Sequence, residues 1–212
     1  MKITVDHIPA SPSRRPKRKM TPTSITVHST GNTTSNAKGE RKWLENPTNK
    51  RAASWHYVVD ENDIIEAIPP NEVSFHAGTT EGNNTSISIE MCESGNRAVV
   101  LKRTQELVQY LMDKHNIRVV KRHYDWSKKN CPRILNNDGK WTEWFQFLGE
   151  IFKPKGVKEM ELNEAQEKIR QEAMRLGITD GKNPFREVNQ HYVWSALIPL
   201  AKRIEELEKK CK

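Results

Sequence analysis

Three side chains of this sequence could together bind a metal ion. His28, His123 and Cys131 supply two imidazoles and a thiol, which are ligand types that zinc prefers. Seven residues separate His123 from Cys131 in the segment RHYDWSKKNCP, which we interpret as a loop that could bring both side chains to one ion. Three protein ligands would leave the fourth tetrahedral position to water. The alternative is that all three residues are structural, because lone histidines and cysteines more often pack or form hydrogen bonds in a core.

Two predicted strands would position His28 and a carboxylate. Apolar and polar residues alternate over 24–30 (SITVHST), which places His28 on the polar face of a strand. They alternate again over 85–92 (TSISIEMC), with Glu90 on the polar face. Glutamate is depleted in strands. Glu90 is therefore either a functional carboxylate or an exposed or ion-paired strand residue.

The remaining periodicities predict an α/β domain that ends near Phe152. Two short apolar segments flank a polar turn, which is typical of a β-hairpin, and a Gly/Asn/Thr-rich loop follows them. The apolar residues that follow have the helical period. One short predicted strand and an amphipathic helix come after them. These elements are the hairpin 55–59 and 64–68, the loop 76–85, the helix 100–115, the strand 119–120 and the helix 141–152.

The chain is basic, with a net charge of +8 and a pI near 9.4. Five of the cations lie within Arg14–Lys19, a segment that we interpret as a solvated arm. The charge suits a polyanionic partner such as nucleic acid, anionic lipid or teichoic acid. No helix-turn-helix, zinc-finger or RNP-type motif accompanies the charge, which argues against a nucleic-acid-binding protein.

The cysteine content and the hydropathy of the sequence indicate the cellular compartment in which the protein is made. The three cysteines, Cys92, Cys131 and Cys211, are odd in number and widely spaced, so a disulfide framework is not expected. No apolar stretch approaches the roughly 20 residues that span a bilayer. The basic N-terminal segment also lacks the apolar run of a Sec signal peptide. We therefore expect synthesis in the cytoplasm, with no membrane span and no signal peptide.

Five segments of the sequence together resemble one enzyme family. The resemblance is to the type-2 N-acetylmuramoyl-L-alanine amidases, which include phage endolysins, bacterial autolysins and peptidoglycan recognition proteins. It implies a mixed central β-sheet flanked by helices and a Zn²⁺ ion bound by His28, His123 and Cys131. The matching segments occur in the family's order over about residues 20–152 and are TPTSITVHSTGNT, ASWHYVVDENDIIEAIP, SFHAG, NTSISIEMC and HYDWSKKNCP.

The resemblance also implies a reaction, the hydrolysis of the amide between N-acetylmuramic acid and L-alanine in bacterial peptidoglycan. Zinc would polarise the amide carbonyl and lower the pKa of the attacking water. Glu90 would take the proton from water and pass it to the leaving amine. Lys129 matches the family position that stabilises the oxyanion; the alternative is a solvated lysine in a basic segment.

Two further residues are expected to contact the substrate. Many relatives have a tyrosine directly before the histidine of the second segment, where this chain has Trp55. An indole donates an N–H but cannot accept a proton, so proton transfer rests more heavily on Glu90. His76, in SFHAG, is expected to bind substrate in the cleft, with a hydrogen-bonded structural role as the competing interpretation. His56 and Cys92 are expected to be structural.

The residues beyond the first domain are expected to form helices. One helix is predicted over 162–176, and a second after Asn189, where Pro199 should kink or break it. These helices would either bind the cell wall or dock on the catalytic domain or on a second copy of the chain. The predicted units are a zinc amidase catalytic domain over 1–153, a linker over 154–161 and a small α-helical domain over 162–212.

The resulting hypothesis is a phage or prophage endolysin that cleaves peptidoglycan after release through holin pores. A host autolysin would share the chemistry. The alternative from another class is a non-catalytic peptidoglycan recognition module, but such members usually lose the ligand cysteine, whereas this chain has Cys131. The expected partners are bacterial peptidoglycan and anionic wall polymers, and not nucleic acid.

Overall fold

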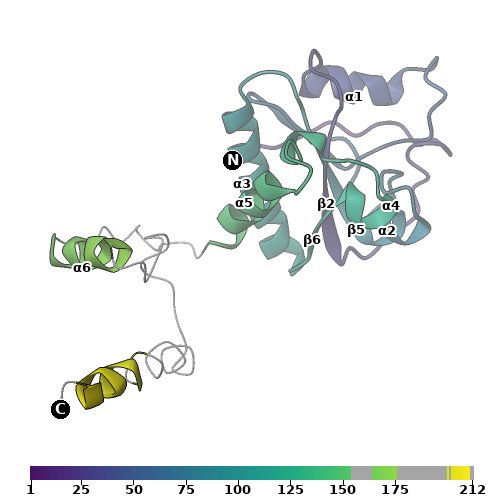
Figure 1. Ribbon diagram of the computed structural model, residues 1–212. Coiled ribbons are helices and arrows are strands. Elements are labelled where there is room, and N and C mark those ends of the chain that lie inside the picture. Colours follow the sequence, from purple (N-terminus) through teal and green to yellow (C-terminus); the bar gives the residue numbers. More distant parts are fainter. Residues whose placement is uncertain (154–163, 176–199, 201, 211–212) are drawn as a thin grey trace. The chain divides into compact units, whose positions relative to one another are not determined.

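The computed structural model describes residues 1–153, 164–175, 200 and 202–210. The chain divides into two compact units, Met1–Lys153 and Pro154–Lys212. In the second unit the described residues form helix α6 (Glu164–Arg175) and a further helical segment over 202–210 (Figure 1). The predicted linker and the predicted break at Pro199 lie outside the described residues. No described helix has both the length and the apolar character needed to cross a membrane.

A six-stranded mixed sheet forms the centre of the first unit, in the order β1-β4-β3-β5-β2-β6. Figure 1 labels its strands β5, β2 and β6. Within the sheet, β3 and β4 pair antiparallel, and the other neighbouring pairs are parallel. The predicted mixed sheet and its hairpin are therefore confirmed. The strands are β1 (Thr4–Val5), β2 (Ser24–Ser29), β3 (Tyr57–Val59), β4 (Ile64–Glu66), β5 (Ser86–Met91) and β6 (Val120–Arg122).

The two faces of the sheet are covered by different helices. α3 (Arg97–His115) and α5 (Thr142–Phe152) pack together on the face that carries Ile25 and Val27 of β2. α1 (Ala37–Glu45) contacts β3 and β4, where Leu44 packs with Val58 and Ile65. Tyr57 and Val58 belong to opposite clusters, as the alternation of a strand requires. The polar residues of β2 and β5 therefore point away from the α3–α5 layer.

The helix α3 begins three residues earlier than its apolar spacing predicts. The side chain of Asn96 accepts hydrogen bonds from the backbone N–H groups of Ala98 and Val99. Such a cap satisfies two donors that the first helical turn leaves free. The helix ends at His115, and the next residue, Asn116, has a φ of 52° in the left-handed region.

The segment predicted as a loop over 76–85 contains a helix, α2 (Thr80–Thr85). The Thr79 hydroxyl accepts a hydrogen bond from the backbone N–H of Gly82 and begins the helix. Gly82 is required here, because a Cβ would lie 2.4 Å from the Cβ of Ala77 and 2.9 Å from the ring of Trp126. The loop prediction is wrong for 80–85 because six residues are too few to show an apolar period.

The segment between the two predicted ligands is also not a simple loop. α4 (His123–Ser127) occupies its first half. Asp125 accepts hydrogen bonds from the backbone N–H and the guanidinium of Arg122, which supports the first turn. Lys128, with a φ of 61°, ends the helix and turns the chain back toward Cys131. A short 3-10 helix, η1 (Arg133–Leu135), follows.

The interpretation of Arg14–Lys19 as a solvated arm is wrong for its first two residues. Arg14 is buried and donates hydrogen bonds to the carbonyls of Leu44 and Asn46. The last carbonyls of a helix have no intrahelical donor, so this guanidinium supports the end of α1. Arg15 forms an ion pair with Glu72 at 2.9 Å. Part of the positive charge near the N-terminus thus forms hydrogen bonds and an ion pair within the folded domain.

Candidate metal centre and active-site cleft

The ends of three parallel strands bring the candidate site residues together. His28 lies opposite Glu90 in the β2–β5 register, one residue before each strand ends. β6 pairs parallel with β2, with Arg122 opposite Val27. His123 directly follows β6, so it emerges at the end of the sheet where His28 lies. The carboxyl ends of parallel strands meet at one edge, which is where α/β folds commonly place a site.

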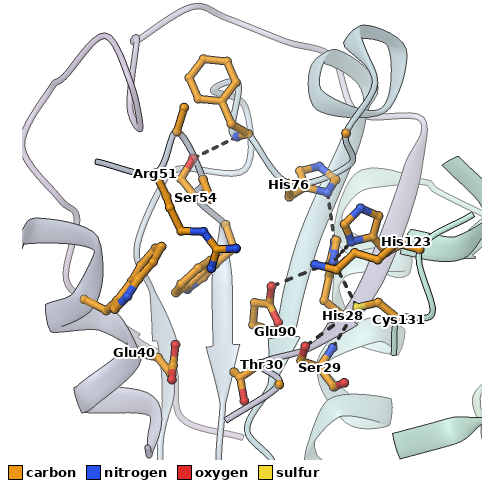
Figure 2. A pocket seen from close by; sticks show the side chains of 18 of the residues that line it. His28, Ser29, Thr30, Glu40, Arg51, Ser54, His76, Glu90, His123 and Cys131 are labelled. Atoms are coloured by element: carbon orange, nitrogen blue, oxygen red, sulfur yellow. Dashed lines mark hydrogen bonds and ion pairs between the residues drawn. The ribbon is translucent and has the colours of Figure 1, made fainter. Parts of the chain in front are cut away.

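His28, His123 and Cys131 meet in the interior (Figure 2). Their donor atoms all lie within 4.8 Å of one another. His28 Nδ1 is 3.1 Å from His123 Nδ1 and 3.8 Å from Cys131 Sγ. A tetrahedral zinc ion would separate two nitrogen ligands by about 3.3 Å, and a nitrogen from a sulfur ligand by about 3.6 Å. The donor types and their spacing therefore fit a zinc ion.

Burial controls the protonation of these three groups. It lowers the pKa of His28 well below its ordinary value, helped by the neighbouring His76 and His123, and lowers the pKa of His123 to about 4. Both imidazoles are then neutral at pH 7, the form that binds a metal. Burial raises the pKa of Cys131 to about 12, so a thiolate needs a strong positive charge beside it. A bound cation would supply that charge, and the backbone N–H of Ser29 approaches the sulfur at 3.4 Å.

Glu90 is a carboxylate at the same centre. Its Oε1 lies 4.0 Å from His28 Nδ1, and its buried Oε2 has no hydrogen-bond partner in the described part of the chain. Burial raises the pKa of Glu90 to about 8, with Glu40 acting in the same direction and Lys129 opposing it. A carboxyl group with a raised pKa can take up and release a proton near neutral pH.

Lys129 lies at the rim of the same centre. Its side chain is exposed and lines the cleft that contains Glu90. Its positive charge lowers the pKa of His28, Glu90 and Cys131, so the ammonium group acts on the whole centre. The structure thus places a cation beside Glu90 and the predicted metal ligands.

A cleft of about 1130 Å³ extends from this centre. Trp55 lines the cleft but is only 6% exposed, and it stacks on Trp43 with ring centroids 5.6 Å apart. The Trp55 Nε1–H has no hydrogen-bond partner among the described residues. Figure 2 shows Arg51 and Glu40 across the cleft from His123. A cleft of this volume, with groups of both charges, suits a polar substrate.

Glu40 and Arg51 line the cleft and are not among the residues that the sequence predicts for the site. Glu40 is buried on the face of α1 that also buries Ala37 and Leu44, and burial raises its pKa. A carboxylate at apolar helical spacing is a signal that could have identified it. Arg51 lies in a polar segment between α1 and β3, where the sequence pattern offers no such signal.

The two residues expected to be structural, His56 and Cys92, are both buried. His56 lies between the Ser88 hydroxyl, at 2.9 Å, and the carbonyl of Glu72, at 2.8 Å. Cys92 is 2% exposed and packs in the cluster beneath α1. His76 lies against His28, so it belongs to the metal centre as well as to the cleft wall.

The mixed sheet, with a buried His–His–Cys cluster and a carboxylate at the ends of its parallel strands, defines an α/β domain with a candidate metal-dependent hydrolase site. The family model for N-acetylmuramoyl-L-alanine amidase matches residues 18–134, which is more than half of the chain of 212 residues. The chain therefore belongs to the N-acetylmuramoyl-L-alanine amidase family.

Two curated relatives come from Bacillus subtilis (strain 168). N-acetylmuramoyl-L-alanine amidase XlyA is 41% identical over 141 residues, covering 63% of this chain and 47% of XlyA. N-acetylmuramoyl-L-alanine amidase CwlH is 39% identical over 159 residues, covering 70% of this chain and 60% of CwlH. The solved structure of the catalytic domain of XlyA matches with a TM-score of 0.65 at 38% identity, covering 71% of this chain and 99% of that domain. This chain thus spans about half to three fifths of the curated relatives' length.

Proposed function

We propose that this chain is a zinc-dependent N-acetylmuramoyl-L-alanine amidase that hydrolyses the amide between N-acetylmuramic acid and L-alanine in bacterial peptidoglycan. The observation that carries the proposal is the convergence of His28, His123 and Cys131 beside Glu90 in a member of this family. The retained thiol at Cys131 favours an enzyme over a non-catalytic recognition module, because zinc needs three protein ligands to act as a hydrolase centre.

Each side chain of the centre would have a different role in the reaction. Bound zinc would supply a Lewis acid for the carbonyl and lower the pKa of water. Glu90 accepts the proton that water loses as it attacks the carbonyl carbon, and returns it to the amine nitrogen as the C–N bond breaks. Lys129 offsets the negative charge that develops on the carbonyl oxygen. Trp55 lines the wall against which the substrate would lie, and His76 borders the same cleft beside His28.

Digestion of purified peptidoglycan followed by mass spectrometry tests this function. An amidase releases intact stem peptides with a free N-terminal alanine and leaves the glycan strands uncut. New reducing ends without free alanine would instead identify a glycosidase and overturn the proposal. An endolysin and a host autolysin share this outcome, and a holin gene beside the coding sequence would distinguish the phage enzyme.

Lys129→Met is expected to lower kcat by about 10²–10³-fold, the usual loss when one oxyanion donor is removed. Methionine keeps the length of the side chain but removes the ammonium group, so zinc content and KM should change little. Steady-state kinetics on a soluble muropeptide measure the effect. Lys128→Met is the matched control, because Lys128 is adjacent but does not line the cleft. Equal rates for both variants would remove Lys129 from the reaction.

A chain ending at Lys153 is expected to fold and hydrolyse soluble muropeptide at the full rate. All residues of the two described hydrophobic clusters, and all of the candidate site, lie within Met1–Lys153. We propose that residues 162–212 increase action on intact walls, so the truncated chain should clear whole cells less well, since only the wall offers repeated attachment. Lysis assays, thermal melting and light scattering make the comparison. A lowered melting temperature, or a change in the number of chains per particle, would indicate docking or dimerisation instead.

A further inference from the structure

The third histidine of the centre, His76, has both ring nitrogens engaged by the protein. Its Nδ1 lies 3.0 Å from His28 Nε2, and its Nε2 lies 3.2 Å from the carbonyl oxygen of Ser86. The residue is 8% exposed, although it borders the cleft. Figure 2 shows His76 above His28, on the far side of that ring from Cys131.

The hydrogens in this chain of contacts have one consistent arrangement. A carbonyl oxygen only accepts, so His76 Nε2 carries the hydrogen that it donates to Ser86. In a neutral imidazole the other nitrogen is then an acceptor. His76 Nδ1 therefore accepts from His28 Nε2, and His28 Nε2 must carry a hydrogen. This leaves His28 Nδ1 with a free lone pair.

That lone pair lies on the side of the predicted metal ligands. His28 Nδ1 is the atom 3.1 Å from His123 Nδ1 and 3.8 Å from Cys131 Sγ. With Nε2 donating to the Ser86 carbonyl, Nδ1 of His76 is the acceptor that faces His28 Nε2.

His76 is itself held by short contacts on the chain around it. Asn83 Oδ1 on α2 accepts hydrogen bonds from the backbone N–H groups of His76 and Ala77, both at 2.8 Å. The Ser86 carbonyl belongs to the first residue of β5. The ring is therefore positioned by a helix and by the same strand that carries Glu90, and is not free to follow a substrate.

We propose that His76 is a positioning residue, which fixes the tautomer and orientation of His28 so that Nδ1 binds zinc. The inference deepens the proposed function and rests on its zinc site. Residues that orient a metal ligand typically contribute about 10–100-fold to metal affinity. This assigns His76 to the metal centre rather than to substrate binding, the other role considered for it.

The test is the zinc dissociation constant of the folded protein, measured by competition with a chromophoric chelator. His76→Ala should raise this constant about 10–100-fold. His76→Asn should recover most of the loss, because its amide oxygen can accept the hydrogen of His28 Nε2. Zinc-saturated variants should keep a KM for soluble muropeptide close to that of the parent chain. The absorption spectrum of the cobalt-loaded protein should change in His76→Ala and return toward the parent spectrum in His76→Asn.

His56→Asn is the matched control, because His56 is another buried, doubly hydrogen-bonded histidine. It should lower thermal stability without changing the zinc constant of the folded protein. An unchanged zinc constant in folded His76→Ala would overturn the inference, and a raised KM in that variant would assign His76 to the substrate. If the parent chain binds zinc but cuts no amide, the proposed function fails while the affinity measurements still decide the role of His76.

Discussion

Cys131→Ala is expected to abolish tight zinc binding and peptidoglycan hydrolysis together. The variant removes the sulfur 3.8 Å from His28 Nδ1 and leaves two neutral imidazoles without an anionic ligand. The loss of zinc affinity should exceed the roughly 10–100-fold effect of residues that only orient a ligand. Metal content by mass spectrometry, and peptide release from purified walls, measure the two consequences on the same preparations.

Cys92→Ala separates this effect from the general cost of losing a buried thiol. Cys92 is 2% exposed and Cys131 is 4% exposed, so both substitutions leave a small cavity in the interior. Cys92→Ala should lose stability but keep one zinc ion per chain. Full zinc occupancy in Cys131→Ala would remove this residue from the ligand set and require another donor. Circular dichroism of the metal-free proteins establishes that each variant is folded.

Glu90→Gln is expected to slow turnover by about 10²–10⁴-fold, the usual contribution of a general acid–base residue. Glutamine has almost the same shape but cannot exchange a proton, so the fold and the zinc content should be retained. Because Glu90 does not supply a donor to the predicted ligand set, the zinc constant and the rate should respond separately. Single-turnover kinetics on a defined muropeptide measure the chemical step.

Glu66→Gln is the control for Glu90→Gln. Glu66 is also a partly buried strand glutamate, but it lies on β4 and accepts a hydrogen bond from the Tyr57 hydroxyl at 2.7 Å. The change should affect melting temperature more than rate. Near-normal wall lysis by Glu90→Gln would show that another group moves the proton.

The sequence by itself determined the two strands that carry His28 and Glu90. Their alternation puts the core residues on one face and the polar side chains on the other, and the structure has this arrangement. A period of two residues is a local property of the chain, so it can be read without knowing any partner strand. The five motif segments placed the chain in its family for the same reason, because each segment is local and their order is visible.

Only the tertiary structure decided how the centre is assembled. The contact between His28 and His123 joins residues 95 positions apart, and it depends on β6 pairing parallel with β2. The contact between His28 and His76 depends on where α2 and its loop pack. Strand order and register follow from the packing of the whole core, and no local periodicity carries that information. For the same reason Arg14, which looks solvated in the sequence, is buried against the end of α1.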